Sequence, residues 1–311
     1  MTLTRRTETS LRTSSPSTTD DADSPADTTG VTCKTRGITS DTLRSSRRRD
    51  APMDRIIITE HEHVLEMRLN RADKRNAADM ELLQQLAVAF GRLNSDPNMR
   101  VGLVTAEGDH FTGGLDLADV GKHMGADGLS YVPDGGLDPW GIHTAQVAKP
   151  VVVAAKGTCY TLGIELILAA DVAVAAHGTR FAQLEVQRGI LPFGGATLRF
   201  AERCGWGNAM RWMLTGETFD DVEAHRIGLV QETCAAEDVD ARARALAQSI
   251  AQAAPLAVAA TLANARLARA AGHAEASALL QPELMRLMAS NDAKKGFVAF
   301  ATRQQAIFSG D

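Results

Sequence analysis

Long apolar runs are missing from this sequence. None reaches the roughly 18 residues that a membrane-spanning helix requires. The N-terminus also lacks the apolar segment of a Sec-type signal peptide. Cysteine is scarce, and the four cysteines form no CxxC pair and no regular spacing, which favours reduced thiols over a disulfide framework. We therefore predict a cytoplasmic protein without a membrane partner.

An excess of basic charge is missing as well. The net charge is −5 at pH 7, and no patch combines basic with aromatic residues, so we predict no nucleic-acid partner. The segment 60–63 reads Glu-His-Glu-His, but it lacks the i, i+4 spacing of a helical zinc motif. We interpret it as a solvated hairpin turn and predict no metal site.

Aliphatic residues are rare at the beginning of the chain. Residues 1–52 are dominated by Ser, Thr, Asp and Arg, and cannot bury enough apolar surface to offset the entropy of ordering. We predict a disordered N-terminal extension. The Arg and Ser content is typical of a transit peptide, but the aspartates between residues 20 and 27 count against that interpretation. An alternative is that the protein begins at Met53.

Apolar periodicity starts after this extension. Leu65, Met67 and Leu69 alternate with charged residues, which is the period of a strand. Strands and helices then alternate, which predicts an α/β core over residues 53–236. The predicted strands cover residues 56–58, 64–69, 101–105, 150–155 and 171–176, and the predicted helices cover residues 79–93 and 163–170. The remainder, 237–311, is rich in Ala, Leu and Arg and predicts a helical oligomerisation region.

One long connection, from about Gly121 to Thr144, has little periodicity. It contains Gly, Asp, Pro and Trp140. Long loops in compact domains are often lids or pocket walls. A mobile surface insertion is an equally good interpretation of the sequence.

Four segments carry residues suited to chemistry, and each is a modest signal alone. They are Leu69–Ala77 (LNRADKRNA), Phe111–Leu117 (FTGGLDL), Gly157–Glu165 (GTCYTLGIE) and Phe181–Arg199 (FAQLEVQRGILPFGGATLR). In this order and spacing they resemble the enoyl-CoA hydratase/isomerase family, also called the crotonase family. The resemblance runs from about Ile56 to Phe308. It implies a crotonase-like spiral of ββα turns, followed by a helical C-terminal trimerisation region, with trimers that commonly pair into hexamers.

Two glutamates are the catalytic residues that the resemblance implies. Glu165 and Glu185 match the carboxylates with which the family's hydratases add water to a 2-enoyl thioester. One orients or deprotonates the water that attacks C3, and the other holds the same water and assists proton delivery to C2. Glu165 also stands within the apolar segment 162–168. A carboxylate with so many apolar neighbours is not expected on a solvent-exposed face.

Backbone N–H groups that stabilise the enolate oxygen form the second part of the implied site. The resemblance assigns them to Ala77 and Leu162. Here the chain departs from the family, because Thr161-Leu162-Gly163 stands where the family usually has three glycines. The Leu162 N–H can stabilise the enolate oxygen only if the φ/ψ at Leu162 suits a residue with a side chain. Tyr160 and Leu162 also add bulk beside the acyl pocket.

The resemblance also implies a set of CoA-binding residues, namely Lys74, Arg75, Gly114, Leu115, Asp116, Leu117, Phe300 and Arg303. Lys74 and Arg75 are expected near the CoA phosphates, because cationic side chains suit such a ligand. Phe300 and Arg303 are expected to reach the CoA of a neighbouring subunit. The alternatives are a solvated charge cluster for the two cations, and core packing for Phe300.

The sequence thus predicts an enoyl-CoA hydratase, which adds water reversibly to a 2-enoyl-CoA and gives a 3-hydroxyacyl-CoA. CoA is part of this substrate, so no separate cofactor is implied. An isomerase would need only one base, and the presence of both glutamates favours hydration. A non-catalytic acyl-CoA-binding homologue stays open because of the altered Thr161-Leu162 segment. The implied assembly is a homotrimer or a dimer of trimers.

Overall fold

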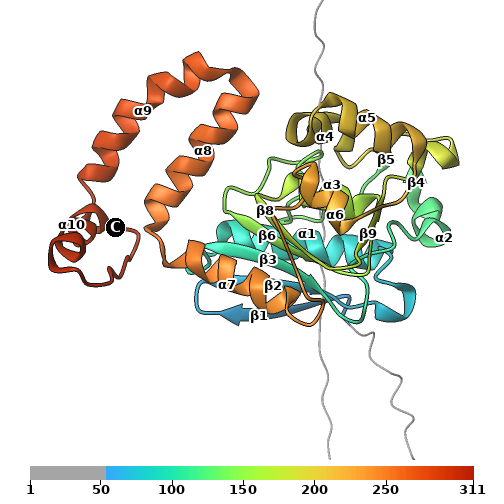
Figure 1. Cartoon of the computed structure of the whole chain (residues 1–311), viewed down its shortest axis with the longest axis horizontal. Helices are drawn as coiled ribbons and strands as arrows, with labels where there is room; N and C mark the ends of the chain where they lie inside the picture. Colours follow the sequence, from blue (N-terminus) through green and yellow to red (C-terminus); the bar gives the residue numbers. More distant parts are fainter. Residues whose placement is uncertain (1–53) are drawn as a thin grey trace, which may run out of the picture. The chain divides into compact units, whose positions relative to one another are not determined.

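The computed structural model describes residues 54–311, so the extension predicted over residues 1–52 lies outside the described part. A six-stranded sheet forms the centre (Figure 1). In spatial order its strands are β1 (Ile56–His61), β2 (Val64–Leu69), β3 (Val101–Ala106), β6 (Val151–Ala155), β8 (Val172–Ala176) and β11 (Glu232–Cys234). The hairpin β1–β2 is antiparallel, and the other neighbours are parallel. The α/β core that the sequence predicts is confirmed.

Smaller strands and helices complete the core. A second sheet has the order β10 (Phe219–Asp220), β9 (Arg180–Ala182) and β7 (Thr158–Tyr160), and a two-stranded hairpin joins β4 (Met124–Gly125) to β5 (Gly128–Leu129). The helices of this part are α1 (Met80–Ser95), α2 (Leu117–Val120), α3 (Leu162–Ala169), α4 (Ala196–Cys204), α5 (Trp206–Thr215) and α6 (Asp221–Arg226). Three short 3₁₀ helices cover residues 72–74, 121–123 and 185–188.

The inner strands of the large sheet are buried on both faces because their residues alternate between two apolar clusters. Val151 and Val153 of β6 belong to the larger cluster, which includes residues of α1 and α3. Val152 and Ala154 point the other way and pack with α7 (Val239–Gln252). Parallel strands that are covered on both faces are expected to read as continuous apolar runs, as β6 does.

Helix α7 lies on the sheet rather than in a separate C-terminal region. Its buried face consists of small residues at helical spacing, namely Val239, Ala243, Ala247 and Ala251. Small side chains allow a helix to approach a sheet closely, so this helix completes the core. The boundary that the sequence suggested at residue 237 therefore divides the core. The helical C-terminal region begins after α7.

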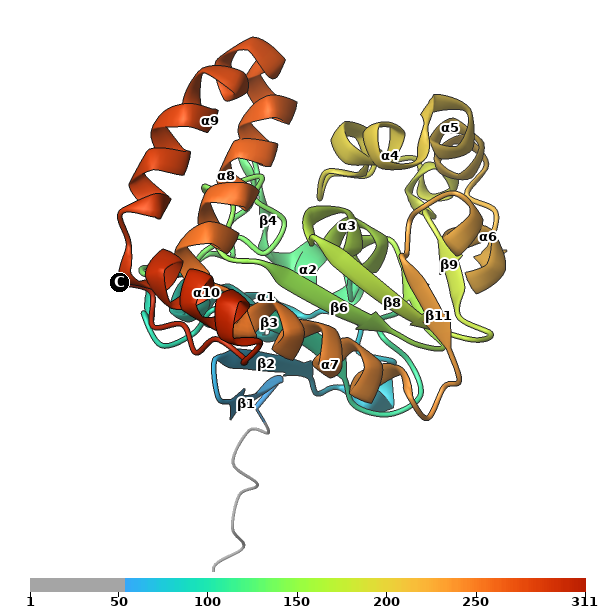
Figure 2. The ribbon, with the colours of Figure 1, turned by 60° about the vertical axis from the view of Figure 1, so that its left-hand side comes forward.

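The last three helices are α8 (Pro255–Ala271), α9 (His273–Met288) and α10 (Asn291–Thr302). Helices α8 and α9 run side by side and extend away from the sheet (Figures 1 and 2). No residue of α8 is fully buried. Large apolar side chains are exposed on α9 and α10, among them Leu280, Leu284, Met285, Phe297 and Val298.

Among the described residues, no single helix is long and apolar enough to cross a membrane. Helices α7 and α8 reach that length and apolar composition only when taken together, and they are bent by 105° relative to each other.

The segment 60–63 does not lie wholly in a turn. Glu60 and His61 end β1, and His61 Nε2 lies 2.7 Å from the buried Glu66 carboxylate.

Candidate active site

A cavity of about 370 Å³ opens between the segments that the sequence singled out. Glu165 of α3 and Glu185 of the 3₁₀ helix 185–188 both line it. The long connection forms another part of the wall, through side chains such as Tyr131 and Trp140. Of the two interpretations of this connection, the pocket wall is therefore the one that holds.

Glu165 is buried in the first turn of α3, with 3% of its surface exposed. Its Oε1 accepts the backbone N–H of Ala196 at 3.1 Å. A side chain at Gly194 would place its Cβ 2.5 Å from Glu165 Oε2, so the absence of a side chain there gives the carboxylate its space. Burial and the nearby charge of Glu185 raise the pKa of Glu165 to about 7, against the opposing effect of the Ala196 and Gly194 amides.

Glu185 is buried as well, and its Oε1 accepts the Gln183 side-chain amide at 3.1 Å. Within the described part of the chain, its other carboxylate oxygen is buried without a hydrogen-bond partner. Burial raises the pKa of Glu185, while Arg188 and Gln183 oppose the shift. Two carboxylates with raised pKa values thus line one cavity, where like charge disfavours joint ionisation.

The unusual Thr161-Leu162 segment carries its strain on Thr161. Thr161 has φ 48° and ψ −112°, a conformation that favours glycine, whereas Leu162 is the first residue of α3. Leu162 itself does not have a positive φ, so its backbone conformation suits a residue with a side chain. A first-turn N–H has no acceptor within its own helix, which leaves the Leu162 N–H at the cavity wall.

The N–H of Ala77 does not occupy the predicted position. It donates to the carbonyl oxygen of Lys74 at 3.0 Å, and Ala77 does not line the cavity. Leu115 does line it, and among residues 54–311 its N–H has no acceptor. The flanking Asp116 N–H donates to Ala78, so the Leu115 N–H points to the opposite side. The hydrogen-bond pattern therefore favours Leu115 over Ala77 as the candidate for the second N–H donor.

The predicted CoA residues do not share one location. Lys74 and Arg75 are exposed beside the segment 111–117, where Gly113 N–H donates to the Arg75 carbonyl at 2.8 Å. Leu115 and Leu117 line a second cavity of about 160 Å³, which shares Leu115, Thr161, Glu185, Ile190 and Phe193 with the first.

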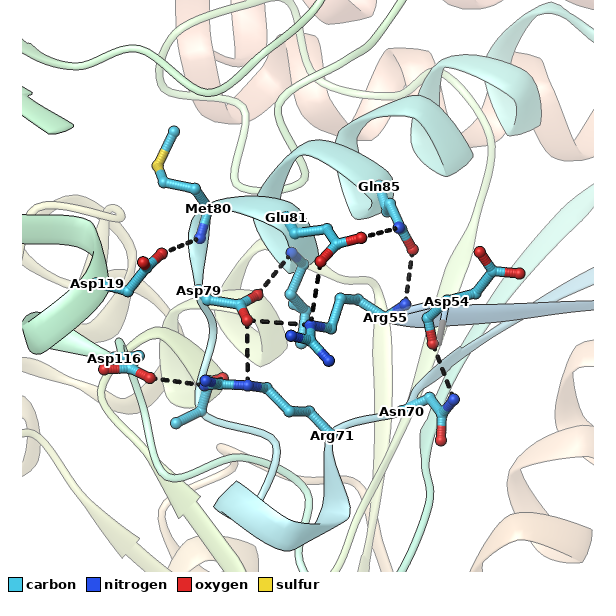
Figure 3. Close-up of polar contacts among 12 residues, drawn as sticks. Asp54, Arg55, Asn70, Arg71, Asp79, Met80, Glu81, Gln85, Asp116 and Asp119 are labelled. Carbon is cyan, nitrogen blue, oxygen red and sulfur yellow. Dashed lines mark hydrogen bonds and ion pairs between the residues drawn. The ribbon is translucent and has the colours of Figure 1, made fainter. Parts of the chain in front are cut away.

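Asp116 is committed to an ion pair within the chain. Its carboxylate accepts a hydrogen bond from Arg71 Nη1 at 2.8 Å (Figure 3). This contact lowers the pKa of Asp116. Arg71 also contacts Asp79, the residue that caps α1 through the Leu82 N–H. This network fixes the turn 114–117, so Asp116 supports the predicted CoA site by positioning its backbone.

Phe300 and Arg303 lie outside both cavities, at the end of α10. Phe300 is 87% exposed, so its interpretation as a core residue is wrong. Its contact with CoA in a neighbouring subunit stays a prediction. Within residues 54–311, no group of three or more His, Cys, Asp or Glu side chains is arranged to hold a metal ion.

Sequence reasoning missed the buried Asp138 and the residues that it holds. Its carboxylate accepts the Tyr131 hydroxyl at 2.6 Å and the N–H groups of three residues that follow it, namely Trp140, Ile142 and His143. Trp140 then donates its indole N–H to the Leu162 carbonyl at 3.0 Å. An Asp in a Pro- and Gly-rich loop is the one signal that could have marked it.

Comparison with known proteins agrees with this geometry. The model of the enoyl-CoA hydratase/isomerase family matches residues 59–311. The chain belongs to this family. A crystal structure of a probable enoyl-CoA hydratase/isomerase from Mycobacterium abscessus is 49% identical, with a TM-score of 0.80 over 83% of this chain and 99% of that one. The predicted family and the crotonase-type fold are confirmed.

Curated relatives are more distant in sequence. The probable enoyl-CoA hydratase echA8 of Mycobacterium bovis is 31% identical over 192 residues, which is 62% of this chain and 73% of the relative. The carnitinyl-CoA dehydratase of Proteus mirabilis is 32% identical over 260 residues, which is 81% of this chain and 97% of the relative. An enzyme of the hydratase/isomerase type is thus supported at the level of the family.

Proposed function

We propose that this protein is an enoyl-CoA hydratase, which adds water to the C2–C3 double bond of a 2-enoyl-CoA thioester. The observation that carries the proposal is the pair Glu165 and Glu185, two buried carboxylates on one apolar cavity. Hydration needs both a base for the water and an acid for the carbon. A double-bond isomerisation needs only one group that moves a proton between C2 and C4.

The backbone N–H groups of Leu115 and Leu162 supply the second requirement. Both residues line the cavity beside the carboxylates, and neither N–H is used in a hydrogen bond within the described residues. Fixed N–H donors stabilise the negative charge that develops on the thioester oxygen without reorganising. We place this oxygen at the part of the wall that both cavities share, with CoA leaving through the smaller one.

The reaction then balances as follows. An ionised carboxylate takes a proton from water, whose oxygen bonds to C3 while the double-bond electrons move toward the thioester oxygen. The enolate re-forms the carbonyl, and C2 takes a proton from the second, protonated carboxyl group. The raised pKa values support a state in which one of the two is protonated and the other is ionised.

The assembly is a further part of this proposal. We propose a homotrimer or a dimer of trimers, in which the exposed apolar side chains of α9 and α10 are covered by a second copy. Phe300 and Arg303 would then reach the CoA of that copy. Light scattering at micromolar concentration tests the state, with a mass of three or six chains expected. A monomer would contradict both the assembly and the role of these two residues.

The catalytic proposal is tested with 2-enoyl-CoA substrates, followed by the loss of the absorbance of the conjugated thioester. A 3-hydroxyacyl-CoA product, identified by mass spectrometry, is the expected result. A 3-enoyl-CoA is assayed in parallel. Migration of its double bond without any hydrated product would favour isomerisation, and binding without turnover of either substrate would favour the non-catalytic alternative.

A further inference from the structure

We infer that the acyl group of the substrate is an uncharged hydrocarbon chain of medium length, about six to ten carbons. This inference rests on the proposed function, because it concerns the same cavity. Its basis is the size of the cavity and the chemistry of the side chains that line it besides the two proposed catalytic carboxylates.

Besides Glu165 and Glu185, the cavity is lined by residues of the long connection and of α1. Apolar and aromatic side chains form this part of the wall, namely Leu83, Met124, Leu129, Tyr131, Trp140 and Ile142. With roughly 30 Å³ for a group the size of a water molecule, the volume holds about a dozen non-hydrogen atoms. A four-carbon acyl group with its thioester would leave much of this apolar surface uncovered.

The two aromatic residues of the wall present rings rather than polar atoms. The Tyr131 hydroxyl donates to Asp138, and the Trp140 indole N–H donates to the Leu162 carbonyl. The rings of Tyr131 and Trp140 meet edge to face, with centroids 6.0 Å apart. Because both polar groups are already satisfied, the wall offers no donor from these residues to a hydroxylated or amidated acyl chain.

Charge completes the argument. Among residues 54–311, the acidic or basic side chains that line the cavity are Glu165, Glu185 and His143. No Lys or Arg of this part of the chain lines the cavity to pair with a second carboxylate on the acyl group, and the ionised carboxylate of the catalytic pair would repel it. A cationic acyl group would compete with catalysis for the same carboxylates. The cavity therefore selects an uncharged chain.

The test compares hydration of 2-enoyl-CoA substrates with four, six, eight, ten and twelve carbons. Each buried methylene is expected to contribute up to about fourfold, so kcat/KM for 2-octenoyl-CoA should exceed that for crotonyl-CoA by about 10- to 100-fold. Glutaconyl-CoA, which carries a carboxylate, and 4-trimethylammonio-crotonyl-CoA, which carries a cation, should both be poorer than 2-octenoyl-CoA. A best rate with crotonyl-CoA or with either charged substrate would overturn the inference.

A binding measurement separates this inference from the proposed reaction. Octanoyl-CoA and butanoyl-CoA lack the double bond, and calorimetry reports their affinities whether or not the protein hydrates anything. We expect octanoyl-CoA to bind at least about 10-fold more tightly. This preference without any hydration would support the acyl class and contradict the hydratase. Hydration with equal affinities for the two saturated ligands and a best rate for crotonyl-CoA would support the hydratase and contradict the inferred acyl class.

Leu129→Trp narrows the far end of the cavity and should lower kcat/KM for 2-octenoyl-CoA by about 10-fold or more, with crotonyl-CoA changed by less than about threefold. Met124→Trp is a second narrowing variant at a half-exposed position, in case Leu129→Trp does not fold. The matched control is Leu214→Trp, on the exposed face of α5 and outside the cavity. If both narrowing variants fold and keep the wild-type chain-length profile, the acyl chain does not lie in this cavity.

Discussion

The Tyr131 hydroxyl donates a buried hydrogen bond of 2.6 Å to the carboxylate of Asp138. The same carboxylate accepts three backbone N–H groups, which leaves no oxygen of this side chain unused. Through Trp140, which donates to the Leu162 carbonyl, the loop is tied to the first turn of α3. One buried anion thus joins the wall of the acyl cavity to the helix that carries Glu165.

We expect Asp138→Asn to weaken this link. An amide group can accept at only one of its two terminal atoms, so it cannot replace all four hydrogen bonds. The free energy of unfolding should fall by about 1–3 kcal/mol. More specifically, kcat/KM should fall by about 10- to 100-fold for 2-octenoyl-CoA and by less for crotonyl-CoA, because the longer chain uses more of the wall.

Asp134→Asn is the matched control, since Asp134 lies in the same loop and is exposed. It should leave both substrates and the stability unchanged. A uniform loss of activity for all chain lengths in Asp138→Asn would mean that Asp138 serves general stability and does not position the acyl wall.

Much of the fold follows from local pattern, and this explains what the sequence could predict. The alternation in Val64–Leu69 and the apolar run of β6 specify buried strands whatever lies beside them. Asp79, at the start of the predicted helix 79–93, is a residue type that favours a helix cap, and it caps α1 through the Leu82 N–H at 2.9 Å. The alanines of α7 gave a helix but not its location, because small residues suit a sheet and a subunit interface equally.

The site was harder to predict than the fold, because it depends more on contacts between segments that are distant in the sequence. The glutamates were recognisable from their motifs, whereas the choice between the Ala77 and Leu115 N–H groups depends on which one is consumed by a neighbouring carbonyl. Likewise, Asp138 acts on residues within its own loop, but its purpose becomes visible only where Trp140 reaches Leu162. Neither relationship leaves a periodic signal in the sequence.

The stability of the protein should depend on pH through Glu165. Burial, with the charge of Glu185, raises its pKa from 4.5 to about 7 in the folded state. The stabilising contribution is therefore complete below about pH 4.5 and is lost as the pH rises through about 7. Glu165→Gln mimics the protonated form, so its advantage over the wild type in free energy of unfolding should be smallest near pH 5 and should grow to about 1–3 kcal/mol above pH 7.

Denaturant titrations between pH 5 and pH 8 measure this difference. Glu217→Gln removes an exposed carboxylate that lies 3.6 Å from Arg211 and serves as the control. It should change the stability by less than about 1 kcal/mol at every pH. A constant difference between Glu165→Gln and the wild type across the range would show that Glu165 is ionised throughout.

Glu66 should show the opposite dependence on pH. Burial alone would raise its pKa, but hydrogen bonds from Arg68, Arg244, Thr105 and His61 lower it to about 2. Its contribution to stability is therefore complete above about pH 4.5 and is lost as the pH falls toward 2. Because Arg244 belongs to α7 and Glu66 to β2, this cluster holds α7 on the sheet.

We expect Glu66→Gln to lower the free energy of unfolding at pH 7 by about 3 kcal/mol. The loss should shrink as the pH falls from 5 toward 3, which chemical denaturation can follow. Glu107→Gln is the matched control, since Glu107 pairs with the same Arg68 at 3.0 Å but at the surface. It should lower stability by less than about 1 kcal/mol. Equal losses for the two variants would contradict the importance of burial.

Thr161→Gly should not destabilise the protein. The φ of 48° and ψ of −112° at Thr161 strain a β-branched residue by about 1–3 kcal/mol, which offsets the entropy that glycine gains in the unfolded chain. The free energy of unfolding should stay unchanged or rise by up to about 2 kcal/mol. In Thr158→Gly, within strand β7, the same replacement should lower it by about 1 kcal/mol or more, because no strain is relieved. Equal losses in thermal unfolding would contradict this assignment of strain.

The last prediction concerns the two carboxylates together. General acid–base groups contribute about 10²- to 10⁴-fold each, so Glu165→Gln and Glu185→Gln should each lower the kcat of hydration by about that factor. Affinity for a saturated acyl-CoA should change little, because the N–H groups of Leu115 and Leu162 and the CoA contacts remain. The double variant should lose much less than the product of the two single losses, since the two groups act as a unit in one reaction. Single-turnover measurements with 2-octenoyl-CoA give the rate constant of the chemical step without interference from product release, and this constant should fall by the same factor. If Glu185→Gln keeps full hydratase activity while Glu165→Gln has none, one carboxylate suffices and the two-glutamate mechanism is wrong for this protein. An isomerase would show that asymmetry in double-bond migration, and wild-type rates in both variants would remove the pair from catalysis altogether.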